Sequence, residues 1–209
     1  LTLQKDYSLV FIRNAPEGLA MYGTKGSYKN QIRLSHAGLR GDGEISYLTS
    51  VTKSPDFIFY PDSVNTHAVN FTLKEVKGAK TEYPPVSGDT TYVHWLPKKD
   101  IMQIFKEKKP ISMYNDSAKF NGRLDLTPLG LTGKGRADFA GSELEAIRMS
   151  FKATKFTSDT ADFRLKSLDD ARFAFKTVNV NALIDFEKRT GEFRTNGKGS
   201  VVTFPANQY

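Results

Sequence analysis

Apolar and polar residues alternate with a period of two along several stretches of the chain. The clearest stretches are Ala161–Leu165, Phe173–Phe175 and Val178–Phe186. Successive side chains of a strand point to opposite faces, so this alternation predicts strands with one buried face. Short clusters of turn-forming residues separate the stretches: Pro61-Asp62, Ser87-Gly88-Asp89, Asn115-Asp116, Asp169-Asp170, Thr190-Gly191 and Asn196-Gly197. The pattern predicts a chain of successive β-strands.

Single aromatic residues recur every 12 positions within this pattern. They form two series: Tyr47, Phe59, Phe71, Tyr83 and Trp95, and then Phe139, Phe151, Phe163 and Phe175. The spacing corresponds to one strand plus a turn, and because it is an even number it returns each ring to the same face. We therefore expect both series to point inward.

A longer repeat contains this spacing. Shifting the chain by 92 positions aligns residues 17–73 with 109–165 without a gap, and 11 of the 57 aligned positions are identical. The densest match is Gly38-Leu-Arg-Gly-Asp-Gly43 against Gly130-Leu-Thr-Gly-Lys-Gly135. The glycines are shared and the charges between them are not, so a tight turn or a close approach of the neighbouring chain explains these glycines better than an Arg-Gly-Asp recognition motif.

One segment departs from the strand pattern. From Pro97 to Lys108, the apolar residues Ile101, Met102, Ile104 and Phe105 have helical spacing, with a proline near the start. We expect one short amphipathic helix near residues 98–108, at the join of the two copies.

Together these patterns predict a mostly β protein with an elongated, repetitive and largely antiparallel architecture, slot-like or solenoid-like, of about twelve or more strands. Residues 1–209 are expected to form a single elongated β-repeat domain built of the two copies. The chain opens at Leu1 without a methionine or a signal peptide, so we expect it to be a segment of a larger protein. Exposed strand edges at its ends could then promote dimers.

Composition narrows the class of protein further. Hydrophobic residues make up 39% and charged residues 25% of the chain, which argues against disorder. No apolar run is long enough to span a bilayer, and no membrane span is expected. The absence of cysteine excludes a thiol nucleophile, a disulfide framework and cysteine-ligated metals.

The chain is basic, with a formal net charge of +7 and a pI near 9.4, which favours anionic partners. The only dense basic patch consists of Lys98, Lys99, Lys106, Lys108 and Lys109. No nucleic-acid-binding motif accompanies it, so we expect no nucleic-acid partner. An anionic lipid or glycan is the ligand that this patch suits, and a solvated basic face is the alternative.

Two segments, residues 57–73 and 149–165, have the pattern of a strand, a polar turn and a second strand, with single phenylalanines and small residues. In this they resemble the envelope β-repeat proteins of the OstA/LptA type, over about residues 35–75 and 127–209. The resemblance implies strands stacked into an open, twisted slot that shields lipid acyl chains in the periplasm of Gram-negative bacteria. The Gly-Asn-Val turn phrase of that family is missing, and the resemblance assigns no site residues.

Candidate catalytic and metal-binding residues are few. His36, His67 and His94 lack metal-ligand spacing, so surface or structural roles are expected and no metal or cofactor is predicted. The acid pairs Glu143/Glu145 and Asp169/Asp170 are the only support for a polysaccharide-degrading enzyme. Asp169-Asp170 fits a turn better. With no nucleophile or zinc signature either, we expect no enzymatic activity.

These observations favour a non-catalytic β-repeat segment of an exported bacterial envelope protein, in the periplasm or at the outer membrane or cell surface of a Gram-negative bacterium. It would act as a scaffold or groove for a lipid, or for other segments of the parent protein. A carbohydrate-binding module or surface adhesin is the alternative, with Tyr92 and Trp95 stacking on a glycan. Trp95 also continues the inward 12-residue series, and that core position fits it better.

Overall fold

The computed structural model describes residues 1–13, 16–167, 173–197 and 199–204. Within these residues the chain forms 21 strands and a single 3-10 helix of three residues, η1 (Pro97–Lys99). The strands pair in a mostly antiparallel manner, as in the successive hairpins of each half of the chain. The predicted mostly β, largely antiparallel fold class is confirmed.

The chain divides into two compact units. Unit 1 comprises Leu1–Lys74, Val86–Ile111 and Asp125–Leu129, and unit 2 comprises Glu75–Pro85, Ser112–Leu124 and the chain from Gly130 onward. The boundary passes through strands β14 (Ile111–Met113) and β15 (Ala118–Thr127). Each unit is built mainly from strands that follow one another along the chain.

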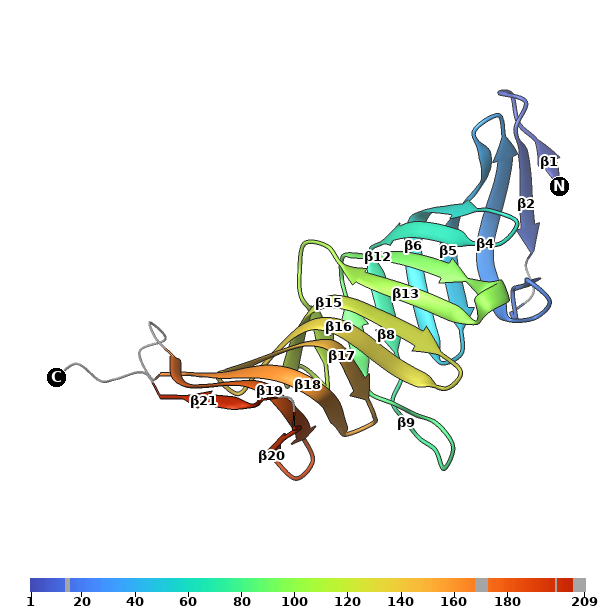
Figure 1. Ribbon diagram of the computed structural model, residues 1–209. Coiled ribbons are helices and arrows are strands. Elements are labelled where there is room, and N and C mark those ends of the chain that lie inside the picture. The colour runs from blue at the N-terminus through green and yellow to red at the C-terminus, as the bar shows by residue number, and fades with distance from the viewer. Residues whose placement is uncertain (14–15, 168–172, 198, 205–209) are drawn as a thin grey trace. The chain divides into compact units, whose positions relative to one another are not determined.

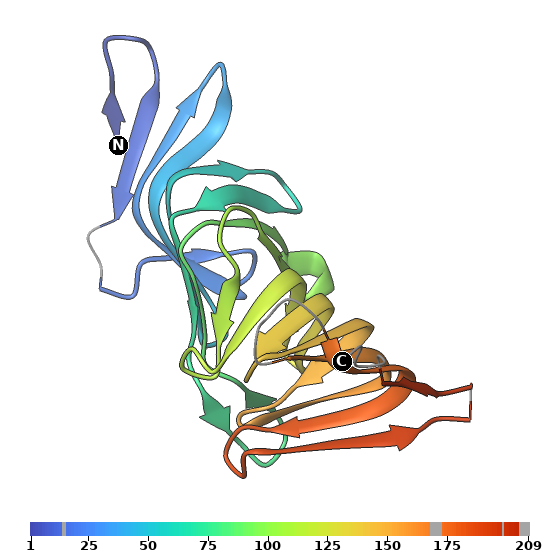
Figure 2. The same ribbon diagram turned by 90° about the vertical axis from the view of Figure 1, so that its left-hand side faces the viewer.

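In unit 1, three ten-residue strands form consecutive hairpins, and β6 then pairs with β7 at one end and with β8 at the other (Figure 1). Strand β12 pairs with β7 on one side and with β13 on the other. Strand β2 lies beside β4, as Figure 2 also shows. The strands of unit 1 are β1 (Thr2–Leu3), β2 (Leu9–Arg13), β3 (Leu19–Met21), β4 (Gly26–Ser35), β5 (Gly38–Tyr47), β6 (Ser50–Phe59), β7 (Val64–Ala68), β8 (Asn70–Leu73), β11 (Val86–Gly88), β12 (Thr91–Leu96) and β13 (Ile101–Lys106).

In unit 2, β16 to β19 form an antiparallel meander (Figure 1). The long strand β19 pairs with β20 through its second half and with β21 nearer its start. Strands β9 and β10 form a separate two-stranded hairpin. Besides β14 and β15, the strands of unit 2 are β9 (Val76–Lys77), β10 (Glu82–Tyr83), β16 (Gly130–Phe139), β17 (Ser142–Phe151), β18 (Lys155–Lys166), β19 (Phe173–Asp185), β20 (Thr190–Thr195) and β21 (Val201–Thr203).

The strand bounds recur with a spacing of 92 residues. Strands β3, β4, β5 and β6 correspond to β14, β15, β16 and β17, each shifted by 92 at both ends. The buried and exposed positions of β6 and β17 match one for one. The strand pairings also match, because Phe59 pairs with Val64 as Phe151 pairs with Phe156. Positions 92 residues apart can therefore be compared directly between the two units.

The shared glycines lie where the two copies need a backbone without a side chain. The β5–β6 ladder shifts register between Gly41 and Gly43, and the β16–β17 ladder shifts between Gly133 and Gly135. Gly43 has φ +153° and Gly135 has φ +144°, a region that residues with a Cβ rarely adopt. A Cβ at either position would also collide with a backbone oxygen of the preceding strand. These glycines permit a bulge at the same place in each copy.

The 12-residue aromatic series forms much of the core. Seven of its nine rings are buried, in agreement with the predicted inward orientation, and the other two, Phe139 and Phe175, are half-buried. In unit 1 the indole of Trp95 lies 5.4 Å from the ring of Tyr22 and 5.2 Å from that of Tyr47, centre to centre. In unit 2, Phe151 and Phe156 contact each other at 5.6 Å.

The helix predicted near residues 98–108 is wrong. Residues Ile101–Lys106 form strand β13, which pairs along its whole length with β12. Met102 and Ile104 are buried while their neighbours are half-buried, which is the period of a strand. A window of six residues is too short to separate the two periods, and the ladder with β12 decides the outcome. The one helical element of this segment is η1, which ends at Asp100 in the left-handed conformation.

Candidate functional site

The predicted basic patch does not form one face. Lys98 and Lys99 lie in η1 before β13, whereas Lys106, Lys108 and Lys109 lie at its far end and beyond. A six-residue strand separates the two groups by about 20 Å, at roughly 3.3 Å per residue. Lys109 also forms an ion pair with Asp89 at 3.0 Å. Ile104, one of the apolar residues of the predicted amphipathic helix, is completely buried in β13 and is not available to a ligand.

Tyr92 and Trp95 point to opposite faces of β12. Trp95 is only 1% exposed and belongs to the core, so it cannot stack on a glycan, and that candidate role is wrong. Tyr92 is half-exposed and lies between His67 and Phe105, with ring centres 5.2 Å and 5.8 Å away on the adjacent strands. This row of three rings is what remains of the predicted carbohydrate surface.

The three histidines do not form one cluster. His67 contacts Glu107, with 2.7 Å between Nδ1 and Oε1, His94 is hydrogen-bonded to Asn65, and His36 is exposed in the turn after β4. His67 and His94 lie two register positions apart on the paired strands β7 and β12. No group of three or more metal-ligating side chains is found in the part of the chain that the structure describes.

The acid pair Glu143/Glu145 lies among cations. Glu143 is nearly buried and faces Arg136, Arg164 and Lys166 at 3.6–3.9 Å, and Arg164 also reaches Glu145. Carboxylates surrounded in this way act as structural ion-pair partners rather than as two acids facing across a bond. The other predicted acid pair, Asp169/Asp170, lies outside the described residues.

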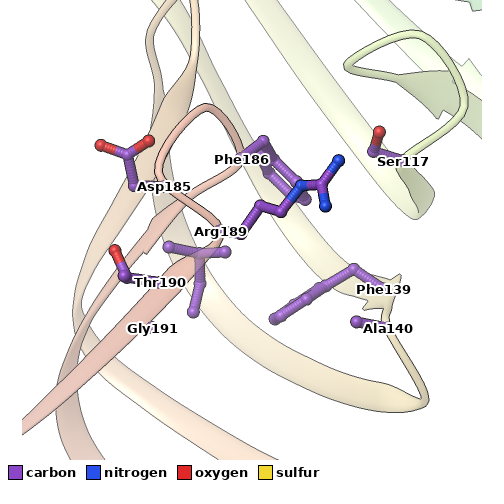
Figure 3. Close-up of a pocket in the computed structure, with 9 residues that line it drawn as sticks. Ser117, Phe139, Ala140, Asp185, Phe186, Arg189, Thr190 and Gly191 are labelled. Atoms are coloured by element: carbon purple, nitrogen blue, oxygen red, sulfur yellow. The ribbon is translucent and has the colours of Figure 1, made fainter.

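Unit 2 contains an open pocket of about 340 Å³, shown in Figure 3. Phe139 at the end of β16 and the residues around the end of β19, Ile184 and Phe186, give it an apolar lining. Arg189 and Thr190 contribute from the turn that leads into β20. Its volume lies at the lower end of the range of small-molecule sites, about 300–1,000 Å³.

The back of this pocket is a packed aromatic cluster. The Phe186 ring stacks on Tyr114 with centres 4.2 Å apart and meets the edge of Phe139 at 6.0 Å. The Tyr114 hydroxyl donates a hydrogen bond to the Lys155 carbonyl oxygen at 2.9 Å. Burial raises the pKa of Tyr114 well above its ordinary value, so this wall stays neutral.

The charges at the pocket are unequal. The Asp185 carboxylate is buried and accepts hydrogen bonds from the backbone N–H groups of Glu187 and Lys188 at 3.1 Å and 2.9 Å, which fixes the turn. Arg189 is exposed, with φ +56°, and forms no ion pair with any described residue. Figure 3 shows its side chain extending from the turn toward Ser117. The pocket therefore offers a free cation, while its acid is already engaged.

Unit 2 also has a second apolar area, which we call the phenylalanine surface. It consists of the buried ring of Phe163, the half-buried rings of Phe175 and Phe193, and the exposed Phe204 and Val202, whereas Val201 points to the other face of β21. Phe163 contacts Phe193 at 4.3 Å, and Phe175 contacts Phe204 at 5.2 Å. Phe204 is 72% exposed and the two valines are 54% exposed. Exposed apolar residues that cluster in this way mark interaction sites.

Two cations lie on the opposite face of these strands. The Lys176 ammonium lies 4.8 Å from the centre of the Phe173 ring, and the Arg164 guanidinium lies 5.9 Å from it. Lys176 and Arg164 pair across β18 and β19, next to the pair of Leu165 and Phe175, so they point to the face opposite Phe175. Arg164 is also paired with Glu143 and Glu145, so the phenylalanine surface itself is apolar.

Sequence reasoning missed both sites. Phe186, Phe193 and Phe204 fall outside the 12-residue series, and their clustering depends on how β20 and β21 pair with β19. The only sequence signal was the density of phenylalanine toward the end of the chain.

Comparisons of the chain with protein-family models, curated proteins and solved structures gave no significant match. In the described part of the chain, no helix has the length and apolar character that crossing a membrane requires.

Proposed function

We propose that this chain is a non-catalytic β-repeat segment of an exported bacterial envelope protein and that unit 2 binds the acyl chains of an anionic envelope lipid. The phenylalanine surface carries the proposal, because it leaves the apolar side chains of Phe204 and Val202 exposed, with Phe204 against the ring of Phe175. The periplasm or the outer membrane of a Gram-negative bacterium is the location that fits such a ligand.

Apolar contact supplies the main driving force. Complete burial of one phenylalanine or valine side chain contributes about 1.5–3 kcal/mol. Phe204 and Val202 together can therefore hold an acyl chain even after the cost of ordering it is subtracted. Lys176, on the opposite face of the same strands, attracts an anionic headgroup only over a distance. The net charge of +7 acts in the same direction over a longer range.

Flotation with lipid vesicles tests the proposal. Wild type should float with vesicles that contain phosphatidylglycerol and much less with pure phosphatidylcholine. The double variant Phe204→Ser, Val202→Ser should lose binding. Ile147→Ser is the matched control, because Ile147 is 75% exposed on β17 and lies outside the phenylalanine surface. Equal flotation of the double variant and wild type would contradict the proposal.

The lysines of unit 1 form a separate arm of the same experiment. Changing Lys98, Lys99, Lys106 and Lys108 to glutamate should weaken binding to anionic vesicles through the loss of long-range attraction. This effect should fade at high salt, whereas the effect of Phe204→Ser should persist. If the glutamate variant binds as wild type does at low salt, these lysines serve solubility alone.

Protein partners are the second outcome that the same surface allows. Val201–Thr203 forms β21, which pairs with the first part of β19, and another segment of the parent protein or a second copy could extend the sheet there. Analytical ultracentrifugation separates this from lipid binding. A dimer that the Val202→Ser change dissolves, without any vesicle binding by wild type, would favour a protein partner.

A carbohydrate-binding role is the alternative function, favoured by the row of His67, Tyr92 and Phe105 on the outer face of unit 1. Half-exposed rings of this kind can stack on the face of a sugar. Binding to a glycan array that Tyr92→Ala removes, with no binding to vesicles, would support this alternative over the lipid proposal.

A further inference from the structure

The pocket in unit 2 has a filled counterpart in unit 1. In unit 1, Val64 pairs with Trp95, and Trp95 pairs with Met102. In unit 2, Phe156 occupies the position 92 residues after Val64, and it pairs with Ile184, which in turn pairs with Gly191. Ile184 therefore stands in the place of Trp95, and Gly191 stands in the place of Met102.

Two more positions at the pocket show the same reduction in size. Ala140 lies 92 residues after Leu48, and Ser117 lies 92 residues after Lys25. Both Ala140 and Ser117 line the pocket. Of the four large side chains that unit 2 replaces, Trp95 and Met102 are buried, so their replacement by Ile184 and Gly191 accounts for the open space, whereas Leu48 and Lys25 are exposed in unit 1.

The walls of the space are retained. Trp95 lies between Tyr22 and Tyr47 in unit 1, and the residues 92 positions later are Tyr114 and Phe139. A Cβ at Gly26 would lie 2.6 Å from the Trp95 ring, and the corresponding residue in unit 2 is Ala118. Unit 2 thus keeps these aromatic walls, and the smaller ring of Phe186, which contacts both Tyr114 and Phe139, takes the place of the indole.

We propose that this pocket is a binding site for a small planar aromatic carboxylate. The ring of the ligand lies in the open part of the pocket, against Phe139, Phe186 and Ile184. Its carboxylate meets the guanidinium of Arg189, which has no acidic partner among the described residues. Arginine is suited to this role because it can donate two parallel hydrogen bonds to one carboxylate.

The two acids near Arg189 are engaged by other groups, so its guanidinium remains available to a ligand carboxylate. Asp185 is held by two backbone N–H groups of the turn, and Glu187 lies 3.8 Å from Lys77. The site is separate from the phenylalanine surface and does not depend on the lipid proposal. It contains apolar walls, one cation and an opening to solvent, which are the usual parts of a small-ligand site.

The test uses 5-fluoroindole-3-propionate as the probe, observed by fluorine NMR. Wild type should broaden and shift its signal at millimolar probe concentration, and the neutral amide of the same probe should bind roughly tenfold to a hundredfold more weakly. Arg189→Gln should weaken binding of the acid by a similar factor and leave the amide unchanged. Lys188→Gln is the matched control, because it removes a charge from the same turn outside the pocket lining.

Filling the pocket gives an independent test. Ile184→Trp restores the residue type of unit 1 and should abolish probe binding. Gly191→Met introduces the methionine that unit 1 has at Met102. Gly191 is exposed, and a Cβ there would meet the flexible end of the Ile184 side chain at 3.2 Å rather than backbone atoms. This variant should therefore fold even if Ile184→Trp does not, and it should reduce affinity at least tenfold.

The site is overturned if wild type leaves the probe signal unchanged at millimolar concentration, or if Gly191→Met binds the probe as well as wild type does. Equal loss of acid and amide binding in Arg189→Gln would overturn the assignment of the carboxylate to Arg189. Phe204→Ser should not alter probe binding, so failure here and failure of the lipid proposal can be told apart.

Discussion

Two glycines of β16 with nearly the same φ angle offer a controlled test of why the repeat retains its glycines. Gly130 has φ +143° and Gly135 has φ +144°. A Cβ added at Gly130 meets nothing within 4 Å, whereas at Gly135 it collides with the Asn121 carbonyl oxygen and lies 2.8 Å from the Gly122 Cα. Alanine at both positions adds the same backbone strain, but only alanine at Gly135 also forces two strands apart.

The expected costs follow from these contacts. Strain at a disfavoured φ costs about 1–3 kcal/mol, and this is the whole effect expected for Gly130→Ala. Gly135→Ala adds overpacking against the backbone of β15, which costs about 1–3 kcal/mol more. A chain of this size loses roughly 2–4 °C in Tm for each kcal/mol. Gly135→Ala should therefore melt about 2–12 °C below Gly130→Ala.

Thermal and urea unfolding followed by far-ultraviolet circular dichroism measures both variants under identical conditions. The ordering should be wild type, then Gly130→Ala, then Gly135→Ala. If Gly135→Ala is as stable as Gly130→Ala, the close approach of β15 does not explain the glycine. If Gly130→Ala is as stable as wild type, the backbone strain has been overestimated.

Three further outcomes are expected. Burial raises the pKa of both Tyr28 and Tyr114 in the folded state. Above about pH 10 the unfolded chain therefore binds fewer protons than the folded one, and the free energy of unfolding falls as pH rises. Tyr28→Phe and Tyr114→Phe should each make that decline shallower in urea titrations between pH 9 and 11. Trp95→Ala should lower the free energy of unfolding by about 3–5 kcal/mol, whereas Ile147→Ser should change it by less than about 0.5 kcal/mol, as chemical denaturation will show. Gly191→Met should raise Tm by filling the pocket, by an amount equivalent to about 0.5–2 kcal/mol, and a lower Tm in scanning calorimetry would speak against an empty pocket.

The sequence was most informative where backbone geometry and burial act together. Period-two alternation predicts strands directly, and the 12-residue series placed rings such as Phe71 and Trp95 in the core because an even spacing keeps them on one face. The glycines of the repeat indicated tight backbone approaches, and Gly43 and Gly135 show why.

The sequence was least informative where the outcome depends on which strands become neighbours. Ile101–Lys106 has helical spacing, but the ladder with β12 makes it a strand and separates the lysines at its two ends. The pocket could not be found from sequence alone, because Ile184 and Gly191 correspond to Trp95 and Met102 only through strand pairing and not through the 92-residue spacing. The phenylalanine surface likewise depends on β20 and β21 both pairing with β19.

The lipid proposal is the central claim, and native mass spectrometry tests it most directly. The chain would be exported to the periplasm of a Gram-negative host and purified without detergent, in parallel with the Phe204→Ser, Val202→Ser variant. We expect wild type to carry a bound anionic lipid, seen as a mass adduct that collisional activation releases, and the variant to lack it. A wild-type spectrum with only the mass of the bare chain would contradict the claim.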